Sequence, residues 1–396
     1  MKHGGAEHQK MTRRGFLKGT AAAALAVSSS RLAASDEPAA APEEKPVRSS
    51  PTSDCRRWRG FNLHNMFYLK GAGAFQEHDF RWIADWGFNF VRVPVAYQMI
   101  TIKRDPYRFD EWWLNELDQA LEYARRYGIH VCLNLNRVPG HPAHDEWEEP
   151  YRLWKDQAAL DAFCHLWRAL AERYEDIPPD RLSFNLINEP PGGGLGEDMA
   201  TADYVRVITA VTEIIRKVTP DRPINTDGLL WGIFPCPELT DLGIGQSCHN
   251  YVPFEISHHE ASWIKGSDAW PEPVWPGLES QGFYEAYSKG FTWDRTKLEE
   301  FYQPWFDLAA QGVPVFCGET GTYNKTPHPI ALAWLRDVLD MLRKHNIGWA
   351  LWNFRDTFGI LDSGRADIEY EDFNGHKLDR KLLSLLQEFS GARPIT

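Results

Sequence analysis

The stretch LSFNLINEPPGGG, residues 182–194, decides the fold because an apolar run in it stops abruptly at an amide, an acid and a turn. The apolar residues predict a short buried strand, and the prolines and glycines that follow predict a loop. Asn188 and Glu189 therefore stand where a strand gives way to a loop. Polar residues at such a point indicate a functional rim if other strands of the same sheet end in the same way.

Short apolar runs of this kind alternate with amphipathic segments along most of the chain. Alternation of strands and helices over about 330 residues predicts an α/β fold, a (β/α)8 TIM barrel. An open doubly wound sheet is the structural alternative, because alternation alone does not prove closure. The expected strands are 59–65, 88–95, 129–136, 182–190, 223–231, 244–251, 313–321 and 347–354, with helices at 111–128, 157–176, 203–218, 297–312 and 329–346.

The residues at the ends of these runs favour the barrel over the open sheet. Nearly every run delivers a polar or aromatic side chain, and a barrel gathers the carboxyl ends of its strands at one rim. An open sheet could not bring all eight ends together. The rim residues expected in this way are Asn62, His64, Arg92, Asn134, Asn136, Asn188, Glu189, Trp231, His249, Tyr251, Glu319 and Trp352.

Two of the rim residues are acids, Glu189 after the fourth strand and Glu319 after the seventh. Paired carboxylates flanking one bond are what glycoside hydrolysis requires, since one protonates the leaving oxygen and the other attacks or activates water. A lone glutamate at a strand end is more often solvated or salt-bridged. Two glutamates in Gly/Pro-rich turns with polar rim neighbours favour a catalytic pair.

The motifs around these acids resemble those of a known family. They are VRVP with Arg92, NEP with Asn188 and Glu189, HNY with His249 and Tyr251, GET with Glu319, and LWNF with Trp352. Each motif alone is weak, but their order and spacing are specific. Residues 58–389 resemble glycoside hydrolase family 5, the cellulase-like retaining glycosidases.

The resemblance implies roles for individual residues. Glu189 would be the general acid/base and Glu319 the nucleophile that forms a covalent glycosyl-enzyme. Asn188 would hold the sugar 2-hydroxyl, a contact that strengthens in the transition state. Arg92 and Tyr251 would bond to Glu319 and keep it ionised. By the same resemblance, His249 would lie near the acid/base and Trp352 would stack on the reacting sugar.

The chain departs from the family pattern at the end of the third strand. Members that cut cellulose usually carry an acid and a histidine there, in a pattern like DLH. This chain reads NLNRVPGH, with Asn134 and Asn136 at those positions and His141 in the following loop. Asn136 and His141 remain candidate substrate-binding residues, but the departure leaves the identity of the sugar open.

A segment of about 40 residues between Tyr251 and Trp293 has no clear periodicity. Stretches of this length in compact domains are usually lids or binding loops. It carries Trp263, Trp270 and Trp275 before Trp293, and an indole face suits the apolar face of a sugar. The alternative is that these side chains pin the loop to the barrel. We expect the loop to wall off one end of the cleft, so that the enzyme removes terminal sugars or acts on short chains.

The amino-terminal part has the layout of an export signal. Residues 1–35 contain paired arginines, an Ala-rich stretch and small residues, which resembles a twin-arginine signal. Residues 36–55 predict a linker, and residues 56–396 a single catalytic domain with no visible carbohydrate-binding module. The sequence therefore predicts a periplasmic or extracellular protein that does not associate with the membrane once the signal is removed.

Composition narrows the partners. A formal net charge of −12 argues against nucleic acid and suits a neutral carbohydrate substrate. The six cysteines form no CxxC pair, and the histidine clusters lack zinc-hydrolase spacing, so neither a metal nor another cofactor is expected. Cys236 and Cys248 are a possible disulfide. A transglycosylase, a noncatalytic sugar-binding barrel and a metal-dependent hydrolase remain alternatives, and the oligomeric state is open.

Overall fold

The computed structural model describes residues 53–68, 71–141, 149–192, 199–280 and 290–391. The predicted export signal and nearly all of the predicted linker lie outside these residues. Within them, no helix combines the length and the apolar character needed to cross a membrane.

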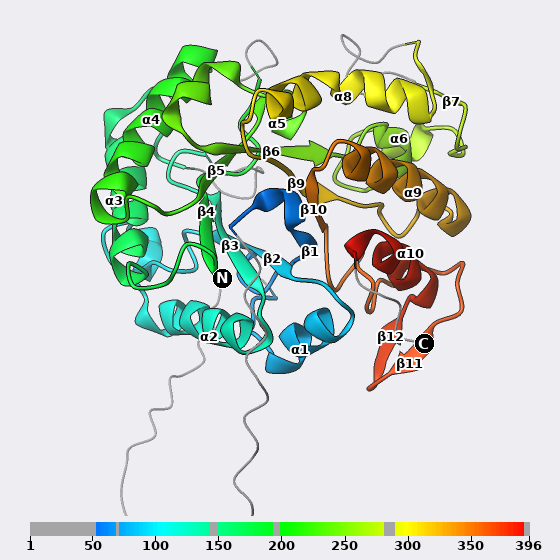
Figure 1. The fold of residues 1–396 in the computed structure, drawn as a ribbon, viewed down its shortest axis with the longest axis horizontal. Coiled ribbons are helices and arrows are strands. Elements are labelled where there is room, and N and C mark those ends of the chain that lie inside the picture. Colours follow the sequence, from blue (N-terminus) through cyan, green and yellow to red (C-terminus); the bar gives the residue numbers. More distant parts are fainter. Residues whose placement is uncertain (1–52, 69–70, 142–148, 193–198, 281–289, 392–396) are drawn as a thin grey trace, which may run out of the picture. The chain divides into compact units, whose positions relative to one another are not determined.

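Eight parallel strands close into a barrel, so the TIM-barrel prediction is confirmed and the open sheet is excluded (Figure 1). Each of the eight lies within or overlaps one of the apolar runs expected from the sequence. The order around the barrel is β1, β10, β9, β6, β5, β4, β3, β2. Their bounds are β1 Arg59–Asn62, β2 Phe90–Ala96, β3 His130–Arg137, β4 Leu182–Asn185, β5 Ile224–Asp227, β6 Gly245–Asn250, β9 Val315–Thr320 and β10 Gly348–Leu351.

Helices surround the barrel (Figure 1). The Asp110 side chain accepts from the Trp112 backbone N–H and starts α2, and Gly128 ends it with a φ of 67°, which a left-handed cap requires. The helices are α1 Glu77–Asp85, α2 Glu111–Tyr127, α3 Gln157–Arg173, α4 Thr201–Val218, α5 Leu229–Gly232, α6 Phe254–Ser257, α8 Arg295–Ala310, α9 His328–Lys344 and α10 Arg380–Ser390, with 3₁₀ turns η1 Cys55–Arg57, η2 Ile102–Arg104, η3 Pro237–Leu242 and η4 Ser267–Ala269.

Two small antiparallel sheets lie outside the barrel. One is built by the pair β7 Leu278–Glu279 and β8 Thr292–Trp293, which belongs to the long segment after β6. The other is built by β11 Glu371–Phe373 and β12 His376–Leu378, which precede α10. The segment after β6 thus has more regular structure than its sequence predicted.

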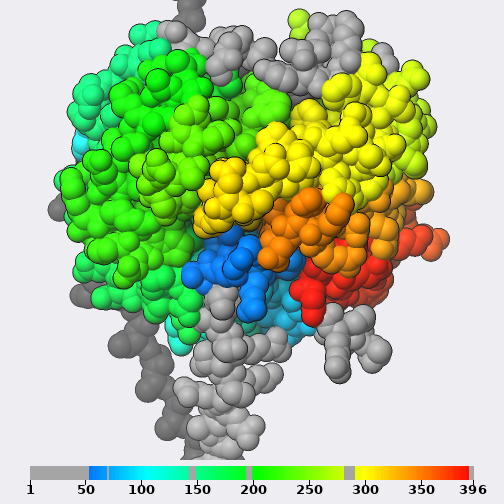
Figure 2. Space-filling model, turned by 45° about the horizontal axis from the view of Figure 1, so that its top comes forward, coloured from blue at the N-terminus to red at the C-terminus, as the bar shows by residue number. Residues whose placement is uncertain are grey.

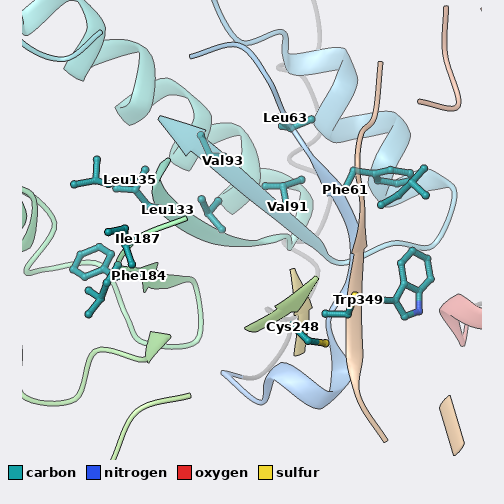
Figure 3. Close-up of a cluster of buried hydrophobic side chains, with 14 of the residues drawn as sticks. Phe61, Leu63, Val91, Val93, Leu133, Leu135, Phe184, Ile187, Cys248 and Trp349 are labelled. Carbon is teal, nitrogen blue, oxygen red and sulfur yellow. The ribbon is translucent and has the colours of Figure 1, made fainter. Parts of the chain in front are cut away.

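The main core fills the space between the barrel and its helices. Val91 and Val93 of β2 and Leu133 and Leu135 of β3 pack into it, at positions that alternate with residues facing the barrel interior (Figure 3). Arg92, between the two valines, instead bonds to side chains from other strands inside the barrel. Strand alternation therefore supplies both the packing and the polar interior.

A separate apolar cluster fills the barrel at the amino-terminal ends of its strands. Cys55, Trp58, Phe90, Cys132, Phe316 and Ala350 form it. The start of the domain, blue in Figure 2, lies at the centre of one face among the green, yellow and orange segments. This plug leaves the opposite, carboxyl ends of the strands for a site.

His130 is buried beside this plug, and its ionisation should link stability to pH. Its Nδ1 lies 2.9 Å from the Asp180 carbonyl oxygen and its Nε2 lies 2.9 Å from the Ser183 hydroxyl. Burial lowers its pKa from 6.5 to about 4. The unfolded chain therefore binds more protons between these pH values, and the stabilisation present above pH 6.5 is lost as the pH falls to about 4.

At about 1.4 kcal/mol per pH unit, His130 should contribute about 3 kcal/mol to this loss. We expect urea unfolding of the wild type at pH 7 and pH 4.5 to show a steep fall in unfolding free energy, and His130→Gln to show a shallower one. Equal falls in both proteins would contradict this assignment.

The possible disulfide between Cys236 and Cys248 is not formed. All six cysteines are free thiols. The Cys236 thiol lies 3.4 Å from a carboxylate oxygen of Glu238, whereas Cys248 pairs in register with Cys317 on the neighbouring strand β9. The two thiols point to different neighbours, which spacing along the chain could not reveal.

Candidate active site

Four ionisable side chains meet at the carboxyl ends of four consecutive strands of the barrel, β4, β5, β6 and β9. Glu189 follows β4, Asp227 ends β5, His249 lies in β6 and Glu319 lies in β9. Arg92 reaches them from β2 through the barrel interior. The closed barrel therefore brings together residues that are up to 227 positions apart in the sequence.

Glu319 is held at both oxygens. Arg92 donates from Nη1 to Oε1 over 2.7 Å, and the Tyr251 hydroxyl donates to Oε2 over 3.0 Å. Burial raises the pKa of Glu319 to about 7, while positive charge on His249 and Arg92 acts to lower it. An ionised carboxylate satisfies both donors, whereas a neutral acid would have to place its proton against one of them. The predicted contacts of Glu319 with Arg92 and Tyr251 are present.

Glu189 has different surroundings. His249 Nδ1 lies 2.8 Å from its Oε1, a contact that the family resemblance implied. Its backbone has a φ of 48°, in the left-handed region, and its N–H donates to Asp227 Oδ2 over 3.1 Å. The Glu189 side chain is 15% exposed, compared with 5% for Glu319. Glu189 is thus the more accessible of the two acids.

The two acids are close together. One oxygen of each carboxylate and one ring nitrogen of His249 all lie within 4.8 Å of one another. Retaining glycosidases hold their carboxyl groups about 5–5.5 Å apart, whereas inverting enzymes need about 6.5–9.5 Å to admit a water. The separation of Glu189 and Glu319 therefore fits the retaining geometry.

His249 stands among three carboxylates. Besides Glu189, its Nδ1 lies 3.6 Å from Glu319 Oε2, and its Nε2 lies 3.1 Å from Asp227 Oδ2, though not in hydrogen-bond alignment. Burial acts to lower the pKa of His249, but the charges of Glu319 and Asp227 outweigh it and hold the pKa well above its usual value. These charges therefore favour the cationic form of the imidazole.

Asp227 is the site residue that the sequence did not assign to rim or core. It is fully buried and accepts from Asn185 Nδ2 over 3.0 Å and from Arg92 Nη2 over 3.4 Å. Burial acts to raise its pKa, but the nearby His249 and Arg92 lower it to about 2. The low pKa keeps it ionised at any working pH. In the sequence it shows the same feature as the other rim residues, a polar side chain at the end of a strand.

The other predicted residues lie around this centre. Arg92 donates from Nη2 to Asn188 Oδ1 over 2.7 Å, and His141 Nε2 lies 2.9 Å from the Asn188 carbonyl oxygen. Asn136 is buried, and its amide has no hydrogen-bond partner among the described residues. Trp352 is partly exposed, and its ring lies 4.0 Å from that of His64.

A local irregularity positions Asn136. In the β2–β3 ladder Val95 pairs with Leu135 and Ala96 with Arg137, so the register skips Asn136. Bulges of this kind re-aim a side chain beside an active site. Asn134, two residues earlier, donates to Asn185 Oδ1 over 2.8 Å inside the barrel. The two asparagines of the unusual third strand therefore differ, since the Asn134 amide nitrogen is bonded inside the barrel whereas the buried Asn136 amide has no bond to the described residues.

Glu189, His249 and Glu319 are also spaced closely enough to ligate a metal ion. The Arg92 guanidinium, 2.7 Å from Glu319, already neutralises one of these ligands. The cationic form of His249 also has no lone pair to offer a metal. The donor set therefore fits proton transfer better than metal binding.

Comparisons with known proteins agree with this geometry. The family model described as cellulase (glycosyl hydrolase family 5) matches residues 43–357. Endoglucanase C of Acetivibrio thermocellus is 24% identical over 315 residues, covering 75% of this chain and 89% of that protein. Cellodextrinase A of Ruminococcus flavefaciens is 24% identical over 283 residues, covering 69% and 76%.

Solved structures share the fold. A crystal structure described as a glycoside hydrolase is 37% identical with a TM-score of 0.78, covering 84% of this chain and 99% of that one. Cel5A of Thermotoga maritima in complex with cellobiose is 22% identical with a TM-score of 0.67, covering 84% and 97%, and supports the barrel. With the family model covering most of the chain, we conclude that it belongs to glycosyl hydrolase family 5 and is a retaining glycoside hydrolase.

Proposed function

We propose that the enzyme cleaves β-linked glycosides with Glu319 as nucleophile and Glu189 as general acid/base. The observation that carries this assignment is the asymmetry of the pair. Glu319 accepts hydrogen bonds at both oxygens from Arg92 and Tyr251, whereas Glu189 is more exposed and contacts an imidazole. A nucleophile must be ionised, and an acid/base must exchange a proton with a group outside the protein.

The two steps follow from these positions. Glu319 attacks the anomeric carbon and the glycosidic C–O bond breaks, while Glu189 gives its proton to the leaving oxygen. Water then attacks the same carbon, Glu189 takes the proton from water, and the bond to Glu319 breaks. Asn188, Trp352, His141 and Asn136 would bind or orient the sugar at this centre.

The loop after β6 supports a proposal on substrate size. Trp275 and Trp293 are buried, and Trp275 donates to Asp337 over 2.9 Å. These two tryptophans therefore pin the loop to the barrel, which was the alternative to sugar binding. Trp263 differs because it is 55% exposed. Trp275 and Trp293, being buried, are not free to stack on a sugar, whereas Trp263 is.

Trp263 is tied to the site through other aromatic rings. It packs edge-on against Tyr323 at 4.8 Å, and its ring lies 6.1 Å from that of His258. His258 in turn lies 4.9 Å from the ring of Tyr251, which bonds to Glu319. We propose that Trp263 stacks on a sugar beyond the cleavage site and that its loop limits the chain, so that the enzyme removes terminal sugars or cuts short oligosaccharides. The name of the relative cellodextrinase A is consistent with short substrates, although other relatives are named endoglucanases.

Product analysis tests this proposal. On a soluble β-glucan we expect reducing ends to appear without a rapid loss of viscosity, and on cello-oligosaccharides we expect Trp263→Ala to raise KM roughly 5- to 20-fold through lost stacking. Trp112→Ala is the matched control, because Trp112 is also 55% exposed and contacts a neighbouring ring, Trp113, but lies on α2. A rapid viscosity loss would refute the short-chain preference, and addition of an acceptor sugar would reveal transglycosylation.

We also infer export, on the strength of Arg13 and Arg14 and the Ala-rich stretch that follows them. On this proposal residues 1–35 are removed and residues 36–55 link the signal to the barrel. Amino-terminal sequencing of the mature protein tests both boundaries.

A further inference from the structure

Asp227 contacts both Arg92 and His249, the residues that bond to the side chains of Glu319 and Glu189 respectively. Its Oδ2 lies 3.4 Å from Arg92 Nη2, and Arg92 holds Glu319. The same oxygen accepts the backbone N–H of Glu189 and lies 3.1 Å from His249 Nε2, and His249 holds the Glu189 side chain. Among the described residues, no carboxylate other than Asp227 is placed against both the Arg92 that holds Glu319 and the His249 that holds Glu189.

We propose that Asp227 is a positioning residue shared by the two acids, which keeps a proton on His249 Nε2 and thereby turns Nδ1 toward Glu189. The proposal rests on the roles given above to Glu189 and Glu319. A proton can then pass along the 2.8 Å contact from Nδ1 of the imidazolium to the Glu189 carboxylate, which leaves a neutral ring protonated at Nε2 and a neutral carboxylic acid, and it can return the same way without a change in the total charge of the site. No bond other than this N–H or O–H bond forms or breaks.

The charges around His249 show why Asp227 has this effect. Glu189 and Glu319 face Nδ1, and Asp227 faces Nε2. The nearby cation is Arg92, whose Nη2 lies 3.4 Å from the same oxygen of Asp227. Two further neighbours are uncharged: the Tyr251 ring lies 6.3 Å away, and the Tyr302 hydroxyl of α8 donates to the His249 carbonyl. Asp227 is therefore the one carboxylate at Nε2 among the described residues, and the two acids at Nδ1 change their own ionisation during the reaction.

The backbone gives a second reason for a carboxylate at this position. Glu189 has a positive φ, a strained conformation that a residue other than glycine keeps only when its surroundings enforce it. The bond from the Glu189 N–H to Asp227 Oδ2 fixes that conformation. Asn185 occupies the other oxygen, so the carboxylate cannot rotate away.

The pH dependence of kcat/KM in Asp227→Asn tests the proposal. Asparagine keeps the shape but removes the charge. We expect kcat to fall roughly 100-fold with KM nearly unchanged, and both limbs of the pH profile to move to lower pH. The alkaline limb should move further, by about one pH unit, because Asp227 lies against His249 and acts on Glu319 mainly through Arg92.

Tyr302→Phe is the matched control, because it removes a buried hydrogen bond to the His249 backbone without changing a charge. It should lower the melting temperature and leave both limbs where they are in the wild type. If Asp227→Asn folds and its limbs coincide with those of the wild type, Asp227 has only a structural role and the proposal fails.

A measurement on the wild type keeps the proposal testable if Asp227→Asn does not fold. Imidazole ¹⁵N NMR, with His249 assigned by comparison with His249→Gln, should show Nε2 protonated throughout and the ring cationic well above pH 6.5. A neutral ring with its proton on Nδ1 would overturn the proposal. This result does not depend on turnover, so it separates failure of this inference from failure of the proposed function, in which the wild type would hydrolyse no glycoside.

Discussion

Glu319→Ala is expected to lower kcat/KM on aryl β-glycosides by roughly 10⁴-fold or more, because no covalent intermediate can form without the nucleophile. Glu189→Ala should behave differently on the same substrates. An aryl leaving group needs little protonation, so the first step survives and the glycosyl-enzyme accumulates, which appears as a burst of released phenol.

Azide distinguishes the two roles. In Glu189→Ala, azide replaces water in the attack on the glycosyl-enzyme, so the rate rises and the product is a β-glycosyl azide. In Glu319→Ala, azide occupies the space of the lost carboxylate and attacks the substrate from that side, so the product is the α-azide. NMR of the azide products gives the assignment directly.

Glu319→Gln is the control for volume, because it keeps the size of the side chain while removing the nucleophilic charge and one of the two acceptor oxygens. It should be as inactive as Glu319→Ala, which would show that the loss of activity does not come from the cavity that alanine leaves. If the two azide products were exchanged between the variants, the roles of Glu189 and Glu319 would be the reverse of those proposed.

The sequence predicted the barrel well because its strands are continuous apolar runs. A strand buried on both faces reads as such a run, and β2 with FVRVPVA and β3 with HVCLNLNR show it clearly. The polar residue inside each run, such as Arg92, then marks the barrel interior. The contacts of Glu319 with Arg92 and Tyr251, and of Glu189 with His249, followed from placing matched motifs on that scaffold.

The sequence could not show whether Asp227 faces the rim or the core, and the reason lies in strand β5 itself. Strand β5 reads INTD, only four residues with three polar ones, so alternation gives no signal for which face is inward. Thr226 in fact faces outward to the Tyr204 hydroxyl, and Asp227 faces the site.

The tryptophans of the long loop could not be assigned from the sequence either, because an indole that pins a loop and one that binds a sugar look alike in sequence. Burial separates Trp293 from Trp263, and burial depends on contacts far along the chain.

Replacing Arg92 should have the largest effect on stability. The side chain is fully buried and pairs with both Glu319 and Asp227, and it also bonds to Asn62 and Asn188. Arg92→Met leaves two buried carboxylates without this partner, and breaking a buried ion pair in this way costs about 3–5 kcal/mol. Arg92→Lys keeps the charge but not the fork of donors, so it should recover only part of the loss.

The pH dependence of this loss identifies its cause. Without Arg92 the pKa of Glu319, already raised by burial, rises further, so the folded state takes up a proton more readily than the unfolded chain. The destabilisation of Arg92→Met relative to the wild type should therefore be larger at pH 8 than at pH 5 in urea unfolding. Arg173→Met, which breaks a partly exposed pair with Asp118, is the control and should cost under about 1 kcal/mol at both pH values. A loss in Arg92→Met that is equally large at pH 5 and pH 8 would mean that packing around Arg92, rather than the charge it supplies to Glu319, holds this part of the barrel together.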